Sequence, residues 1–145
     1  MKKIITALFF LPLASQILAN EKNNDLYQEF FDNKKLKYET TFNDGKKNGK
    51  EKFWYENGQL KMESDFVDGR ENGLWQQWYE NGQLKLRVEY ENGKENGLWQ
   101  QWYENGQKKS KSEWSNGVKN GFEWQWNRDG ELISKDKYNS GKMVK

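Results

Sequence analysis

The stretch ENGLWQQWYENGQ occurs twice in this chain, at residues 71–83 and again, letter for letter, at residues 95–107. The copies lie 24 residues apart, the step that also separates Trp54 from Trp78. Aromatic and glycine positions follow this step from about residue 30 to residue 141. They include Trp54, Trp78, Trp102 and Trp126; Phe42, Phe66, Tyr90, Trp114 and Tyr138; Gly58, Gly82, Gly106 and Gly130; and Gly49, Gly73, Gly97 and Gly121. A fixed period of this length is typical of stacked repeats, in which each unit packs against its neighbours.

Each repeat is predicted to form a β-hairpin around an Asn-Gly pair. Asn57-Gly58 separates two strand-like runs, and Asn-Gly is the strongest signal for a two-residue type I′ turn, in which both residues have positive φ. Such a turn places Tyr55 opposite Leu60 on one face and Trp54 opposite Lys61 on the other. The same register pairs Phe53 with Met62, Gly49 with Phe66, Lys52 with Glu63, Lys50 with Asp65, and in the next unit Tyr79 with Leu84, Trp75 with Val88 and Gly73 with Tyr90.

A glycine opposite an aromatic residue recurs in each unit, and the ring is expected to shield the glycine backbone. A lone hairpin is marginally stable in water, so the units are expected to stack. Residues 68–73 are predicted to connect successive hairpins, and residues 30–35, FFDNKK, to form a decayed first unit. The predicted fold is all-β: an elongated single-layer antiparallel sheet of stacked β-hairpins over residues 30–145, about four and a half units.

The N-terminal segment is predicted to lie outside this fold. Lys2 and Lys3 precede an apolar run over residues 4–13, and Ala19 supplies a small residue for cleavage. This pattern is typical of a secretory signal peptide over residues 1–19, which is expected to form a short helix. A membrane anchor is less favoured, because the apolar run is too short to span a bilayer comfortably. Residues 20–29 form a lead-in to the repeats, with a short helix an option near residues 25–31. An exported protein with no membrane span after cleavage is therefore expected, in the periplasm, at the cell surface or outside the cell.

Composition excludes several classes of function. Removal of Lys2 and Lys3 with the signal leaves 22 acidic residues and an equal number of basic ones, so nucleic-acid binding is not expected. The chain contains no His and no Cys, the residues that most often bind metals or activate nucleophiles. Carboxylates such as Glu56 and Glu80 recur at the hairpin turns, whereas a glycosidase needs one pair of acids in a cleft. No enzymatic activity, metal or cofactor is predicted.

The segment YENGKENGLWQQWYENGQLK resembles the MORN repeat in its bacterial variant form, and the resemblance extends over residues 30–141. It implies an elongated, twisted, single-layer antiparallel sheet of hairpins. Many bacterial variants carry the name of a toxin–antitoxin antitoxin component, some eukaryotic arrays accompany a lipid kinase domain or bind membranes, and secreted variants occur in host-associated bacteria. The resemblance therefore implies an interaction module and leaves its partner open.

The ladder of Trp54, Trp78, Trp102 and Trp126 is the candidate binding surface. These residues are predicted to lie on one face with about 10 Å between successive rings, because equivalent strands are two strands apart. Lys61, Lys85 and Lys109 are predicted to lie across from the first three, and Ile133 across from the last. Such a surface suits a protein partner, a sugar or a lipid headgroup. The alternative is that the ladder is structural, with lysine stems packed on the indoles. The opposite face, with Tyr55, Tyr79, Tyr103, Leu60, Leu84, Leu86 and Val88, is predicted to be the main core.

Three functions remain open from the sequence. The first is a secreted or envelope-located non-enzymatic module that binds a protein partner, with host contact as one setting. The second is an antitoxin or immunity protein that binds a toxin. The third is a binder of carbohydrate, cell wall or lipid headgroups.

Overall fold

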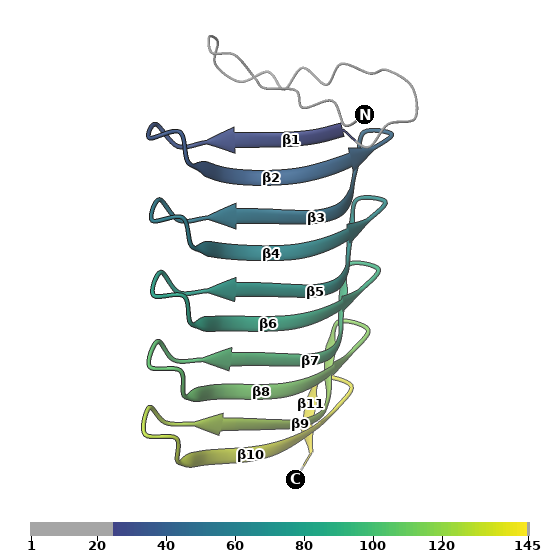
Figure 1. Ribbon diagram of the computed structural model, residues 1–145. Coiled ribbons are helices and arrows are strands. Elements are labelled where there is room, and N and C mark those ends of the chain that lie inside the picture. The colour runs from purple at the N-terminus through teal and green to yellow at the C-terminus, as the bar shows by residue number, and fades with distance from the viewer. Residues whose placement is uncertain (1–24, 145) are drawn as a thin grey trace.

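The computed structural model describes residues 25–144, which form one antiparallel sheet of 11 strands in sequence order (Figure 1). The strands stack one below another, with β1 and β10 at opposite ends, and they curve at the side away from the loops that follow β1, β3, β5, β7 and β9. This confirms the predicted all-β, single-layer antiparallel sheet. The strands are β1 (Asp25–Phe30), β2 (Leu36–Asn43), β3 (Lys46–Trp54), β4 (Leu60–Val67), β5 (Arg70–Trp78), β6 (Leu84–Glu91), β7 (Lys94–Trp102), β8 (Lys108–Ser115), β9 (Val118–Trp126), β10 (Leu132–Asn139) and β11 (Lys142–Val144).

The YENG segments at residues 55–58, 79–82 and 103–106 each close a hairpin with a three-residue loop, so the predicted type I′ turn is wrong. The N–H of Gly58 donates to the Tyr55 carbonyl at 2.9 Å, and the N–H of Tyr55 donates to the Gln59 carbonyl at 2.9 Å. Gly58 has a φ of +90°, whereas Asn57 keeps a negative φ. This is a type I turn followed by a glycine bulge. The same position is taken by Gly82, Gly106 and Gly130, with φ values of +85°, +84° and +87°.

A second bulge next to this loop shifts the register at the strand ends. Phe53 pairs with Met62 as predicted, but Trp54 pairs with Leu60, which leaves Lys61 as the extra residue. The shift recurs in the next two hairpins, where Trp78 pairs with Leu84 and Trp102 pairs with Lys108. The predicted pairs Trp54–Lys61 and Tyr55–Leu60 are therefore wrong. The predictions confirmed are Gly49–Phe66, Lys50–Asp65, Lys52–Glu63, Trp75–Val88 and Gly73–Tyr90.

Two-residue turns join the successive hairpins, and here the type I′ conformation does occur. Asp68 and Gly69 have φ values of +49° and +82°, and the strand pair around them closes at Val67 and Arg70. The same geometry recurs at residues 44–45, 92–93 and 116–117. The predicted connection over residues 68–73 is therefore shorter than expected, because Arg70 already belongs to β5.

A glycine-centred bulge bends the sheet in every repeat. In β4 and β5 the pairing passes from Ser64–Trp75 to Phe66–Glu71, so β5 has two more residues than β4 between these pairs. Gly73 lies in this insertion with a φ of +123°, and a Cβ there would lie 3.1 Å from Asp65 Cβ. The glycine is needed because the chain turns through a conformation that L-residues rarely adopt, against a neighbouring side chain.

The N-terminal part of the array differs from the prediction. Residues 25–29, assigned to the lead-in and considered for a short helix, belong to strand β1, which pairs with β2. Asn33-Lys34 closes this first hairpin: Lys34 has a φ of +64°, and its N–H donates to the Phe31 carbonyl at 2.8 Å. Lys34 thus takes the position of Gly58, as expected for a decayed first unit. The predicted signal peptide over residues 1–19 lies outside the described residues.

Side chains of the WYENGQ segment join each repeat to the next. The hydroxyl of Tyr55 donates to the Trp78 carbonyl at 2.9 Å, and Asn57 Nδ2 donates to the Glu80 carbonyl at 3.1 Å. The tyrosine contact recurs from Tyr79 to the Trp102 carbonyl and from Tyr103 to the Trp126 carbonyl, each at 2.9 Å. The sequence identity of the repeats therefore has a structural reason, since side chains of each unit donate hydrogen bonds to backbone carbonyl groups of the next unit.

The core is thin and lies on one face of the sheet, which we call the core face. All the buried residues belong to it by strand register: Thr40, Glu51, Ser64, Phe66, Val88, Ser112 and Glu123. Val88 is the only fully buried aliphatic side chain among residues 25–144. We call the opposite side the outer face. It carries charged pairs such as Lys50 with Glu63 at 2.5 Å.

Candidate functional site

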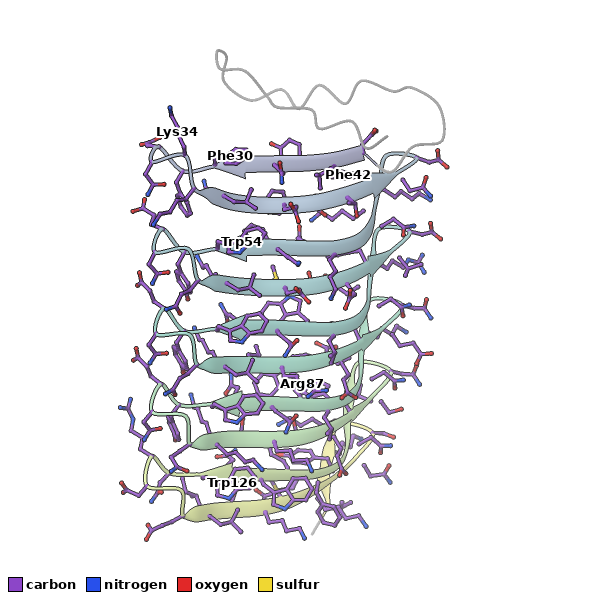
Figure 2. The ribbon with its side chains drawn as sticks, in the orientation of Figure 1. Phe30, Lys34, Phe42, Trp54, Arg87 and Trp126 are labelled. Carbon is purple, nitrogen blue, oxygen red and sulfur yellow. The ribbon has the colours of Figure 1, made fainter. Side chains whose placement is uncertain are left out.

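The predicted tryptophan ladder lies on the outer face, at the ends of β3, β5, β7 and β9. Figure 2 shows Trp54 and Trp126 at matching positions of the stack, close to the three-residue loops. Their partners across the strand pairs are Leu60, Leu84, Lys108 and Leu132, so Ile133 does not face Trp126 as predicted. All four indoles are half-buried. The ladder exists as predicted, and its role in binding stays a prediction.

The three lysines assigned to the ladder lie on the other side of the sheet. The ammonium groups of Lys61, Lys85 and Lys109 lie 5.5, 5.4 and 5.8 Å from the ring centroids of Tyr55, Tyr79 and Tyr103. The predicted lysine–tryptophan pairing is wrong because the bulge at Lys61 moves this side chain to the core face. Each lysine stacks on a tyrosine instead, a cation–π contact of about 0.5–1 kcal/mol at an exposed site.

A trough opens on the core face toward the C-terminal end of the stack. It has a volume of about 430 Å³ and lies over β7, β8, β9 and the start of β10. It is lined by aromatic, amide, hydroxyl and charged residues of the core face, Trp99, Gln101, Tyr103, Lys109, Ser110, Ser112, Trp114, Lys119, Glu123, Gln125 and Ile133, and it is bordered by Trp126, the last residue of the outer-face ladder. The trough forms because small residues, Ser110 and Ser112, lie at its floor between larger side chains on the neighbouring strands.

The sequence contained a signal for this second aromatic row. In LWQQW the two tryptophans are three residues apart, and alternate strand residues point to opposite faces. Trp78 and Trp102 therefore lie on the outer face, and Trp75 and Trp99 lie on the core face. The predicted binding surface included only the ladder, which recurs in four units, and omitted Trp75 and Trp99, which occur in two.

Two carboxylates on the core face, near the two ends of the stack, are paired with lysines. The residue one repeat before Trp75 is Glu51, and the residue one repeat after Trp99 is Glu123. Lys47 pairs with Glu51, and Lys119 pairs with Glu123 at 2.5 Å. Burial and a hydrogen bond donated to Glu51 raise the pKa of Tyr38 far above its ordinary value of 10.0. These carboxylates are held by lysine and tyrosine, so they have structural partners and are not free acids.

Residues 25–144 contain no group of three or more His, Cys, Asp or Glu side chains placed to hold a metal ion. Within the same residues, no helix has the length and apolar character that crossing a bilayer requires.

Comparison with protein families agrees with the repeat geometry. The model described as the MORN repeat variant matches residues 26–44, 47–68, 71–92 and 95–116. These four matches cover more than half of the chain. The chain belongs to the MORN repeat variant family. A comparison with curated protein sequences gave no match.

The matched MORN repeats correspond to the units of the structure. The first begins within β1, before the predicted start of the array at residue 30, and the fourth ends at the turn after β8. Strands β9 and β10 add a further hairpin beyond the matched residues. MORN repeats are generally interaction modules and are not a known enzyme family. They are associated with the binding of proteins or lipids.

Proposed function

We propose that this MORN-repeat protein is an exported, non-enzymatic interaction module that binds an extended segment of a protein partner in the trough on the core face. The observation that carries the proposal is the lining of the trough. Gln101 and Gln125 are amides that can both donate and accept hydrogen bonds, as the backbone of an extended peptide requires. Trp99 and Trp114 flank them with apolar surface, the kind of residue that dominates binding energy at interfaces.

The tryptophan ladder is the weaker candidate for this role. Trp78 faces Leu84 across β5 and β6, and both side chains are half-buried, so much of the ring area is already used within the sheet. The outer face next to the first rungs carries charges that are paired with one another, such as Lys50 with Glu63 and Asp65. A surface whose groups are already paired offers less to a partner.

Carbohydrate is a second candidate for the trough. Sugars present hydroxyl groups together with apolar ring faces. Trp99 and Trp114 supply flat surfaces, while Ser110 and Gln101 supply groups that bind hydroxyls. Lipid headgroups are less favoured by this lining, since Lys119 is paired with Glu123 and Lys109 lies on Tyr103.

Variants on the two faces test the site. Gln125 is exposed, and Gln125→Arg should fill the trough with a longer charged side chain. Gln76→Arg makes the same change on the outer face of β5 and serves as the matched control. The protein would be screened against a displayed peptide library and a glycan array. Peptide ligands lost only in Gln125→Arg support the proposal, and glycan ligands lost only there support the second candidate. Ligands retained by Gln125→Arg and lost in Gln76→Arg would place binding on the outer face.

Export requires a separate test. It is supported by Lys2-Lys3, the apolar run over residues 4–13 and Ala19. N-terminal sequencing of the protein from producing cells should give a start near residue 20, in material outside the cytoplasm. Protein that retains Met1 and is found only in the cytoplasm would contradict export without affecting the binding proposal.

A further inference from the structure

The two ends of the sheet are incomplete in complementary ways. At one end, β11 pairs only with residues 137–139 of β10. Among the described residues, no strand covers the far edge of β10 from Leu132 to Asp136. At the other end, β1 pairs with β2 on one side and has no described strand on the other. Figure 1 shows these two edges at opposite ends of the stack.

The repeat register identifies which part of a strand is present at each end. Asp25 pairs with Phe42 as Gly49 pairs with Phe66, so β1 corresponds to the last six residues of the nine-residue strand β3. Lys142 pairs with Asn139 as Arg70 pairs with Val67, so the three residues of β11 correspond to the start of β5. Strand β11 therefore supplies the first third of a repeat strand, and β1 supplies the remainder.

We propose that β1 of a second copy of this chain pairs antiparallel with the uncovered part of β10 and continues the sheet. The register follows from β8 and β9, where Ser110 pairs with Gln125 and Lys111 pairs with Trp124. One repeat further on, Ser134 of one copy pairs with Glu29 of the next, and Lys135 pairs with Gln28. The contact joins two different edges, so each copy leaves one edge free for a further copy, and the copies add head to tail.

Exposed apolar side chains gather at both edges. Leu132 and Ile133 are 55% and 64% exposed at the β10 end, and Tyr27 and Phe30 are 40% and 48% exposed at the β1 end. In the interior of the stack the equivalent Leu84 is half-buried. An uncovered strand edge with unpaired backbone groups is a template for pairing with another chain. Covering it with a copy would give these residues the environment that the interior repeats have.

Charge and bonding at the joint favour reversible association. Strand β1 carries Asp25 and Glu29 without a basic residue, whereas β10 carries Lys135 and Lys137 with one acid, Asp136. The two edges therefore attract each other more than either attracts itself. The joint lacks the bond that a tyrosine hydroxyl donates to the next repeat, as Tyr103 donates to the Trp126 carbonyl. One repeat after Tyr103 the residue is Asn127, whose side chain bonds within its own loop.

Cysteine cross-linking tests the register, since the chain has no native cysteine. Directly opposed residues in a sheet have Cα atoms about 4.5–5.5 Å apart, within the range that a disulfide spans. A Gln28→Cys variant mixed with a Lys135→Cys variant should give a mixed disulfide dimer on mild oxidation. A chain with both substitutions should give a ladder of higher oligomers. Lys111→Cys is the matched control, because Lys111 has the same repeat position but is covered by β9.

The outcomes separate the possible arrangements. A mixed dimer and a ladder, together with sedimentation velocity that shows reversible growth with concentration, would support the proposal. Disulfides only between two Lys135→Cys chains would show pairing of like edges and overturn it. A monomer at all concentrations, with mixed disulfides no more frequent than with Lys111→Cys, would also overturn it. Circular dichroism of each variant checks that the sheet is intact.

Discussion

Substituting Gly97 by Ala tests why a glycine lies at every bend of the sheet. Gly97 has a φ of +124°. A Cβ at this position would lie 3.0 Å from Glu89 Cβ and would overlap the Glu89 carboxylate oxygen Oε2. That oxygen accepts a hydrogen bond from the Leu98 N–H at 3.2 Å. The added methyl group therefore strains the backbone and displaces the carboxylate from the amide that it binds.

The cost of the Gly97→Ala substitution can be worked out from these two effects. A non-glycine residue in a sparsely populated φ region costs about 1–3 kcal/mol. Loss of a partner for a half-buried N–H adds about 1 kcal/mol, the low end of the usual range, because the site is near solvent. We expect unfolding to become easier by about 2–4 kcal/mol. Gly58→Ala should cost less, about 1–2 kcal/mol, because no atom lies within 4 Å of the added Cβ.

Urea unfolding followed by tryptophan fluorescence gives these free energies by linear extrapolation. The decisive measurement repeats Gly97→Ala in a Glu89→Ala background, where the carboxylate is absent. The cost there should fall toward that of Gly58→Ala, with a coupling of about 1 kcal/mol between the two positions. An equal cost of Gly97→Ala in both backgrounds would refute the proposed role of the carboxylate.

Three further predictions follow from the loops, the ladder and the tyrosines. Gly82→Val should lower the free energy of unfolding by at least about 1 kcal/mol, because a β-branched residue resists the φ of +85° in the glycine bulge; an unchanged melting curve would contradict this. Trp78→Ala combined with Trp102→Ala should reduce stability less than Tyr79→Ala, which also removes the bond to the next repeat; calorimetry that gives the opposite order would mean that the outer face holds the core. The stabilisation that comes from Tyr38 and Tyr79 should be fully present up to about pH 10 and be lost above it, because burial raises the folded-state pKa of both above the unfolded value of 10.0. Urea titrations at pH 8 and pH 11 measure this loss, and a Tyr38→Phe variant should show a smaller one.

The sequence predicted the overall architecture because the repeat period and the pairing of opposite residues are encoded in every unit. Gly49 opposite Phe66 and Lys52 opposite Glu63 were predicted by placing a two-residue turn at Asn57-Gly58, with the matched charges in support, and both pairs occur. The central part of each strand therefore follows simple alternation. The assumed two-residue turn gives the correct register in the strand centres, because the glycine bulge of the loop and the bulge at Lys61 offset each other in the residue count.

Sequence reasoning failed where an extra residue interrupts the alternation. Two bulges lie close together at Gly58 and Lys61, and their effects on residue count cancel in the strand centres but not at the ends. For this reason the predicted pairing of Trp54 with Lys61 is wrong, and so is the prediction that lysines lie next to the indoles of the ladder. A bulge has no distinct residue signature when the bulged residue is a lysine. The trough was missed because Trp99, which lines it, has an equivalent tryptophan in only one other unit, at Trp75.

The order of the strands also determines how the molecule responds to force. In the sheet each strand pairs only with its neighbours in sequence, and β1 and β10 lie at opposite ends of the stack (Figure 1). Tension applied between these ends acts along the direction of the interstrand hydrogen bonds, so it loads one strand pair at a time. The sheet should therefore unzip hairpin by hairpin at low force, with extension in equal steps. The hydroxyl of Tyr79, bonded to the Trp102 carbonyl, spans one of the junctions that resist each step.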